Sequence, residues 1–269
     1  MGLMRMTLQE VFKGALAEIA SGFRRYPVWV ALARESIGDQ HRRTTLGPLW
    51  LVLNYFLFAG AFVVVFGHRN EIENFPAYVA TGLYVWLLMS ETINMAVPLF
   101  RREANYIKGT TLPLFVYVMR LAMQTVIRGA YSGAGWIVLM LFLVQPSLEQ
   151  WLMAFAGLAV IVLALPAVIT IFALLGAFFP DFEFITGNLV RVGMFLTPIF
   201  WIHGNDGGLR QMLYEYNPFT HFLAIVRQPI ISGELPVMEL VLCLGISAFA
   251  WVLAFFLLGA LRKKVVFVV

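Results

Sequence analysis

Charge is scarce in this chain of 269 residues, and that scarcity defines its class. Only 13% of the residues are charged and 61% are hydrophobic, whereas a soluble domain is about 25% charged and about 45–50% apolar. The apolar excess is too large for a surface that faces water. Since a transmembrane helix needs about 20 apolar residues, the chain has room for six spans joined by short loops.

Cysteine and several enzyme motifs are also missing. The single cysteine, Cys243, lies in an apolar run, which excludes an intrachain disulfide and a cysteine-based metal site. No Gly-Lys dipeptide occurs, so a Walker A nucleotide loop is absent. The four histidines have no metal-ligand spacing, and no GxSxG motif is present. The sequence therefore predicts a conduit or a membrane anchor, with no catalytic residue and no bound metal.

The N-terminal segment, residues 1–45, has the pattern of amphipathic helices. In residues 7–25 apolar side chains recur at helical spacing, with charged residues between them. Thr7 and Glu10 form a capping-box pattern that starts this helix, and a second helix is expected at about 28–43. Such helices before a span usually lie in the membrane interface. Packing against a partner as ordinary solvated helices is the alternative.

Six apolar stretches follow in residues 46–269, and together they predict an all-α integral membrane protein. The predicted spans are 49–67, 77–98, 114–144, 151–178, 184–202 and 237–260. Most of the connections are short, so successive helices should be antiparallel neighbours. With both termini in the cytoplasm, the outer side holds only Arg69, Arg210 and Arg227, as the positive-inside rule requires.

Three charged residues fall inside predicted spans, where charge is costly and therefore informative. Glu91, Arg128 and Arg191 lie at similar depth in three different spans, and we expect them to form a polar cluster. One interpretation is an ion pair or triad that locks the helices together. The other is that one arginine stays unpaired and faces an anionic group at the cytoplasmic mouth of a path.

Two connecting segments have unusual composition. Segment 99–113 is a charged loop in which a short helix could enter a groove on a soluble partner; a solvated loop is the alternative. Segment 203–236 is long and apolar, yet neither of its halves can span a bilayer. It predicts a re-entrant or interfacial helical hairpin at the outer face. Aromatic residues gather there, for sugar contact or for interface anchoring: Trp201, Tyr214, Tyr216, Phe219 and Phe222.

Several motifs together carry a family resemblance from about residue 25 to the C-terminus. They are Ala33-Arg34-Glu35, Leu46-Gly47-Pro48-Leu49-Trp50, Phe75-Pro76-Ala77-Tyr78, Pro180-Asp181, Thr197-Pro198-Ile199, and Asn217-Pro218 with Arg227. With them the chain resembles the membrane subunits of ABC-2-type polysaccharide exporters, which export O-antigen, capsule or teichoic acid chains.

The resemblance implies a homodimer in the bacterial cytoplasmic (inner) membrane, together with two copies of a separate ABC ATPase subunit. ATP and Mg would bind to that partner, and this chain would bind no cofactor. The substrate would be a polysaccharide linked to a polyprenyl-pyrophosphate lipid, moved through a channel along the dimer interface. Membrane lipid is the other expected contact, and no nucleic-acid partner is expected.

The resemblance also implies roles for particular residues. The channel would be lined by Tyr55, Phe56, Phe62, Phe195 and Phe200. The ATPase would be contacted by Arg34, Glu35, Arg101, Arg102, Asn105, Ile107 and Lys108, and the 203–236 hairpin would form an outer gate. Where the family often has a basic-aromatic run, this chain has Asp39-Gln40-His41. Pyrophosphate contact at the cytoplasmic mouth therefore rests on Arg42 and Arg43.

Three other functions remain open at this point. An ABC-2 exporter of a drug or small lipid would need a narrower channel with fewer aromatic side chains. A membrane-embedded transferase needs catalytic carboxylates facing one leaflet, but the close acid pairs, Glu71/Glu73 and Asp181/Glu183, lie in short loops. A structural anchor would leave the polar cluster and the apolar hairpin without a purpose.

Overall fold

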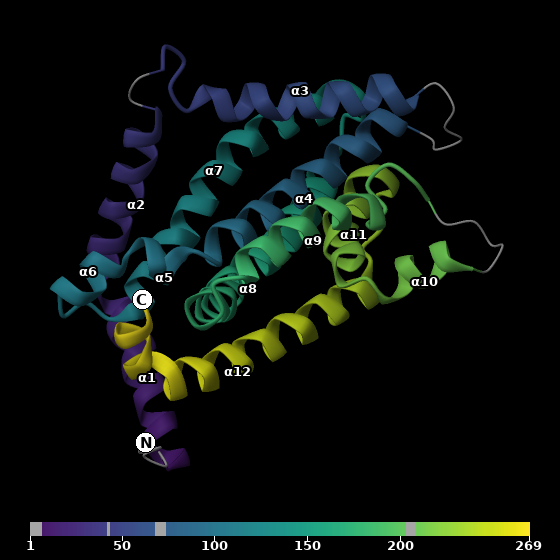
Figure 1. Cartoon of the computed structure of the whole chain (residues 1–269). Helices are drawn as coiled ribbons and strands as arrows, with labels where there is room; N and C mark the ends of the chain where they lie inside the picture. The colour runs from purple at the N-terminus through teal and green to yellow at the C-terminus, as the bar shows by residue number, and fades with distance from the viewer. Residues whose placement is uncertain (1–6, 42–43, 68–73, 203–207) are drawn as a thin grey trace.

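The computed structural model describes residues 7–41, 44–67, 74–202 and 208–269, and within these ranges the chain forms helices joined by short turns, with no strand (Figure 1). The helices are α1 (Leu8–Arg24), α2 (Tyr26–His41), α3 (Leu49–Phe66), α4 (Phe75–Ala96), α5 (Leu99–Arg102), α6 (Ala104–Gly109), α7 (Leu114–Leu143), α8 (Leu148–Phe178), α9 (Phe182–Leu196), α10 (Leu209–Tyr216), α11 (Pro218–Ser232) and α12 (Val237–Val268). The prediction of an all-α chain is confirmed for these ranges.

Helix starts follow local capping chemistry. The capping box predicted for α1 is present, because the Thr7 hydroxyl accepts from the Glu10 backbone N–H and the Glu10 carboxylate accepts from the Thr7 N–H at 2.8 Å. The Asn217 side chain accepts from the Phe219 N–H to start α11. That helix ends at Ser232 and is capped by Gly233, whose φ of 75° suits glycine.

Four helices of the described chain are long and apolar enough to cross a membrane: α3, α7, α8 and α12. They coincide with four of the six predicted spans. Predicted spans two and five are present as α4 and α9, but α4 contains Glu91 and α9 has only 15 residues. Since 15 residues rise only about 22 Å, against a hydrocarbon core of about 30 Å, six complete spans stay a prediction.

The fifth predicted span, 184–202, is shorter than expected for a local reason. Helix α9 ends at Leu196, and Thr197 has an extended backbone directly before Pro198. A residue that precedes proline is disfavoured in the helical region. Residues 197–202 therefore form a turn that leaves the helix axis.

Helix α4 occupies the centre of the molecule, and most of its side chains are buried. It packs against α3 and α7 on one side and against α8, α9 and α11 on the others (Figure 1). Helices α3 and α9 lie at its edges. Tyr55 and Ala59 are the buried residues of α3, and Thr186 is the buried residue of α9. These two helices therefore present broad exposed apolar faces.

Helix α1, near the start of the described chain, and the C-terminus lie at one end of the molecule, here called the terminal end, with α2, α5 and α6 (Figure 1). Helix α1 packs against α12 and α7. The Glu18 carboxylate accepts from the Leu114 backbone N–H, and Arg262 donates to the Gly14 carbonyl. The N-terminal helices thus pack on this chain's own long helices. Leu8, Phe12 and Leu16 stay exposed, as an interface helix requires.

The opposite end, here called the hairpin end, is formed by α10, α11 and the turn after α9. Helix α11 is largely buried against α8, α4 and α12, whereas α10 has no buried residue. The predicted 203–236 segment is therefore a pair of helices of unequal burial, although residues 203–207 lie outside the described chain. Re-entry into a membrane stays a prediction.

Candidate functional site

A polar cluster lies where α2, α4 and α7 meet. The Arg128 guanidinium on α7 donates from Nη1 to Glu91 on α4 and from Nη2 to the Gln40 side-chain oxygen on α2. Arg128 is buried, and its Nε has no hydrogen-bond partner. The structure therefore brings Glu91 and Arg128 together as an ion pair. Sequence reasoning missed Gln40, which joins the pair to the N-terminal helices.

A cavity of about 200 Å³ adjoins this pair between α3, α4 and α7. Its polar lining consists of Asn54, Glu91, Arg128 and Ser132, and the remaining wall is mainly apolar. Glu91 lines this cavity, and its side chain is 43% exposed. A pocket of this kind offers both hydrogen-bond donors and acceptors next to an apolar surface.

Arg191 is not part of the cluster, which corrects the expected triad. Thr186, Val190 and Gly193 of α9 line a cavity shared with Trp86 and therefore form the side that faces α4. Arg191 follows Val190 and so points about 100° away around the helix. Its side chain is exposed, and none of the ion pairs in the described chain includes it. Asn188, one turn earlier, is exposed as well.

Tyr55 does not face a channel in this structure, which corrects its expected role. It is 1% exposed, its hydroxyl donates to the Ala80 carbonyl at 3.0 Å, and its ring meets Tyr84 edge-on. Phe56 beside it is half-buried. The physical reason is that α3 turns Tyr55 toward α4 and α7, where Gly135 leaves room for the ring.

Three phenylalanine rings stack at the hairpin end, and two of them belong to the predicted channel set. Phe62 and Phe66 of α3 each lie 5.1 Å, between ring centroids, from Phe200 in the turn after α9. Phe195 meets Phe200 edge-on at 5.8 Å and is 56% exposed. We call Phe62, Phe66 and Phe200 the aromatic stack. Phe66 was missed, although its spacing of four from Phe62 on a helix was visible in the sequence.

The aromatic side chains predicted for the outer gate do not share one exposed face. The Trp201 indole donates to the Phe195 carbonyl at 3.0 Å. Phe219 packs edge-on against Trp86, whereas Tyr216 is exposed. Burial, with smaller contributions from Tyr78 and Glu239, raises the pKa of Tyr214, and Arg227 opposes that shift. The Tyr214 phenol therefore keeps its proton at physiological pH.

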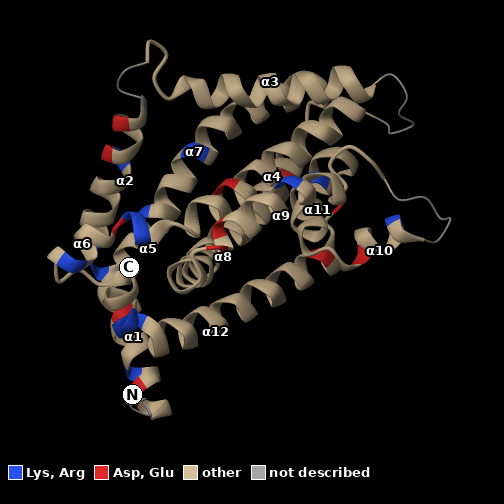
Figure 2. Cartoon of the chain, in the orientation of Figure 1, with Lys and Arg blue, Asp and Glu red and all other residues tan. Residues whose placement is uncertain are grey.

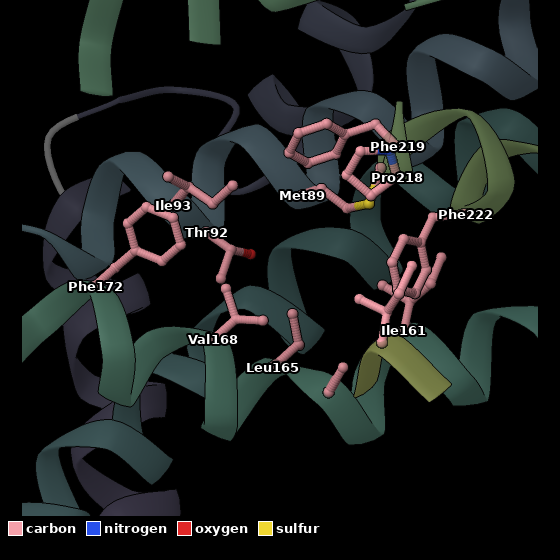
Figure 3. A pocket seen from close by; sticks show the side chains of 12 residues that line it. Met89, Thr92, Ile93, Ile161, Leu165, Val168, Phe172, Pro218, Phe219 and Phe222 are labelled. Atoms are coloured by element: carbon pink, nitrogen blue, oxygen red, sulfur yellow. The ribbon is translucent and has the colours of Figure 1, made fainter. Parts of the chain in front are cut away.

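Phe219 and Phe222 instead line an apolar cavity of about 180 Å³ between α4, α8, α11 and α12. Figure 3 shows both rings and Pro218 above Ile161 and Leu165 of α8, with Met89 of α4 nearby. The predicted sugar-contact surface is consequently divided. Phe219 and Phe222 pack inside the protein, whereas the Tyr216 side chain is exposed.

The predicted ATPase-contact residues lie at the terminal end, where Figure 2 shows Lys and Arg on α1, α5 and α6. Five of the seven are exposed: Arg34, Glu35, Arg102, Asn105 and Lys108. Arg101 forms an ion pair with Glu183.

Ile107 is 7% exposed and packs into the core beside α7, which corrects its assignment to a partner surface. The neighbouring Tyr106 is 63% exposed and was missed. Since residues on successive helical positions point in different directions, a short helix shows a partner only some of its side chains.

Arg42 and Arg43, the predicted pyrophosphate contacts, lie outside the described residues. Within the part of the chain that is described, no group of three His, Cys, Asp or Glu side chains could hold a metal ion.

A family model described as ABC-2 type transporter matches residues 26–231, from the start of α2 almost to the end of α11. A Klebsiella pneumoniae protein named O-antigen export system permease protein RfbA is 24% identical over 217 residues, covering 78% of this chain and 82% of its own length. A Myxococcus xanthus protein of the same name is 22% identical over 222 residues, covering 80% and 85% respectively.

Proposed function

The chain belongs to the ABC-2 type transporter family, and from that premise we propose that it is the membrane-channel subunit of an ATP-driven polysaccharide exporter. The cargo would be a polysaccharide on a polyprenyl-pyrophosphate lipid, moved from the cytoplasmic to the outer side. Two relatives named as O-antigen export permeases support this cargo class. Family membership and four long apolar helices indicate a multi-pass protein of the bacterial inner membrane.

The observation that carries the proposal is the exposure of Arg191 and Asn188 in the middle of α9. Beyond Glu183 in its first turn, the exposed side of the helix is mainly apolar, with Phe184, Leu189 and Val192. An arginine near the bilayer centre costs at least about 2.5–3.5 kcal/mol when it faces lipid. A water-filled path removes most of that cost, so α9 is best placed along such a path.

A second copy of the chain would complete the path. Tyr55, Ala59 and Thr186 are the only buried residues of α3 and α9, so both helices have a free apolar face on which either lipid or a second copy can pack. A homodimer that brings two copies of α3 and α9 together would enclose Arg191 and Asn188. The exposed ring of Phe195 would then lie near the outer end of the path.

An ABC ATPase, in two copies, would bind at the terminal end and would hold the ATP and Mg. Exposed side chains of α2 and of the α5–α6 segment suit that contact: Arg34, Glu35, Arg102, Asn105, Tyr106 and Lys108. Both termini would then be cytoplasmic. Arg42 and Arg43 stay the predicted contacts for the lipid pyrophosphate, and the hairpin stays the predicted outer gate.

The experiment that tests this function is depletion of the protein in its host, followed by localisation of lipid-linked glycans. Build-up of a lipid-linked polysaccharide at the cytoplasmic face, with loss of the same polymer from the surface, is the expected result. Restoration by wild-type protein, but poor restoration by Arg191→Gln, would connect export to α9. Normal surface glycans without build-up would contradict the proposal.

An ABC-2 exporter of a drug or small lipid is the second candidate. The apolar cavity between α4, α8, α11 and α12 favours it, because about 180 Å³ suits part of a small amphiphile better than a sugar chain. Unchanged glycans combined with accumulation of a small lipid in the depleted cells would select this alternative.

A further inference from the structure

Arg227 on α11 is a buried cation without an acidic partner in the described chain. It is 6% exposed, and none of the ion pairs there includes it. Its Nη1 donates to the Pro198 carbonyl at 2.8 Å, while Nε and Nη2 have no hydrogen-bond partner. Burying a charge without a counter-charge costs more than burying an apolar side chain of similar size. Filling the space at position 227 therefore does not explain the arginine, because an apolar side chain of similar size would fill the same space at a lower cost.

The arginine is attached to the turn that follows α9. The Pro198 carbonyl accepts from Arg227 and also lies 3.2 Å from the Tyr78 hydroxyl, which lies 3.1 Å from the Trp201 carbonyl. The Asn217 amide donates to the Thr197 hydroxyl at 2.9 Å. The turn is thus held by side chains of α4 and α11.

The flat guanidinium group of Arg227 packs against Tyr78 and Gly82 of helix α4, and we call these two residues the seat of Arg227. The central carbon of that group lies 3.8 Å from the centroid of the Tyr78 ring, within the range of a cation–π contact. Gly82 is one helical turn further along α4, and a Cβ atom added there would collide with Nη2 of Arg227. The guanidinium group of Arg227 therefore lies against the Tyr78 ring and against Gly82, which are four residues apart on α4.

The turn also carries Phe200, which is part of the aromatic stack with Phe62 and Phe66. Trp201 in the same turn donates to the Phe195 carbonyl. A displacement of Pro198 would therefore move Phe200 off the stack and release the end of α9. Through this turn Arg227 connects the hairpin helix α11 to the aromatic side chains of α3 and α9.

We propose that Arg227 is the positioning residue of the outer gate. Seated between Tyr78 and Gly82, it holds residues 197–201, and with them Phe200, in the closed arrangement while no substrate is being moved. Transport would require this seat to open and re-form in each cycle. The inference rests on the proposed function for the meaning of the gate, but the seat itself is tested without any polysaccharide.

The test uses the purified complex of this chain with its ATPase, reconstituted in liposomes without nucleotide, and measures passive leak of potassium. Arg227→Met keeps the length of the side chain but removes both the carbonyl bond and the cation, and we expect a several-fold higher leak. Arg227→Lys keeps the charge and one donor, so we expect partial closure. Complex size and basal ATP hydrolysis should match those of the wild type.

The glycine provides an independent variant from the opposite helix. Gly82→Ala should raise the leak as Arg227→Met does, because the added methyl group displaces the guanidinium. Gly245→Ala on α12 is the matched control, since a Cβ atom there meets nothing within 4 Å. In the Arg227→Lys background, Gly82→Ala should add little further leak. Lysine has a single terminal nitrogen and lacks the Nη2 atom that the added methyl group would displace.

A leak equal to that of the wild type in both Arg227→Met and Gly82→Ala would overturn the inference. Should Arg227→Met fail to assemble, the comparison of Gly82→Ala with Gly245→Ala decides alone. If these variants leak as expected but depletion shows no effect on surface glycans, the gate holds and the proposed cargo fails. If export is established and no variant leaks, only the role of Arg227 falls.

Discussion

Arg128 on α7 forms its ion pair with a glutamate, Glu91 on α4, that is far more exposed than the arginine. The side chain of Arg128 is 9% exposed and that of Glu91 is 43% exposed. The two charges are therefore not equivalent. Loss of the carboxylate leaves a buried cation without a counter-charge, whereas loss of the guanidinium leaves a carboxylate that is only partly buried.

This asymmetry predicts different effects of two substitutions on stability. Glu91→Leu should lower the free energy of unfolding by roughly 2–3 kcal/mol, below the 3–5 kcal/mol of a fully buried pair because Glu91 is partly exposed. Arg128→Met should cost less. Thermal unfolding midpoints in detergent measure both, with Glu183→Leu at the more exposed Arg101 pair as a control of under about 1 kcal/mol. A larger loss for Arg128→Met than for Glu91→Leu would contradict the argument.

Tyr55 and Phe195 should respond differently to alanine, although both were predicted to line a channel. Tyr55→Ala empties a buried site and should destabilise the protein by about 3–5 kcal/mol. Phe195→Ala should leave stability within about 0.5 kcal/mol of wild type and slow export, because its ring is exposed near the proposed path. Unfolding midpoints and surface-polymer labelling distinguish them. Equal stability of the two variants would show that Tyr55 is not packed as described.

Substitutions at neighbouring positions of α6 should affect two different properties, the coupling of ATP hydrolysis to transport and the folding of the protein. Asn105→Trp and Tyr106→Ala change exposed side chains, so we expect a folded protein in which ATP hydrolysis no longer drives transport efficiently. Ile107→Asp places a charge in the core and should reduce the amount of folded protein. Size-exclusion profiles report folding, and the ratio of transport to ATP hydrolysis reports coupling. Normal coupling in both surface variants would remove α6 from the ATPase interface.

Arg191→Gln should slow export while leaving the unfolding midpoint unchanged. The side chain is exposed and has no ion-pair partner in the described chain, so folding gains little from its charge. Arg191→Lys should retain more export than Arg191→Gln, because it keeps a cation on the proposed path. Export at wild-type rates in both variants would place Arg191 outside that path.

Much of the helical framework was predictable because it depends on local interactions. The capping box of Thr7 and Glu10 and the lengths of α3, α7 and α8 follow from neighbouring residues and from apolar runs. The early end of α9 was also visible in principle, since Pro198 restricts Thr197. The apolar run across this proline nevertheless suggested a longer span.

The rotation of each helix about its own axis was not predictable. Apart from Asn54, helix α3 has apolar or aromatic residues around its whole circumference, so its sequence contains no periodic signal that shows which side faces α4. For that reason Tyr55 was placed in a channel, while the structure packs it inside. The same uncertainty placed Arg191 beside Glu91, although its side chain is exposed and points about 100° around α9 from Val190, which faces α4.

The helical structure, the high apolar content and the ABC-2 type of this chain could be recognised from its residues, because composition, caps and linear motifs are local properties. Which charged side chains meet depends on the packing of the helices in the folded protein. Arg128 finds Glu91 and Gln40, Arg227 finds a tyrosine ring and a carbonyl instead of an acid, and Arg191 finds no ion-pair partner in the described chain. Such pairings join residues far apart in the chain, and they depend on how helices pack and rotate against one another.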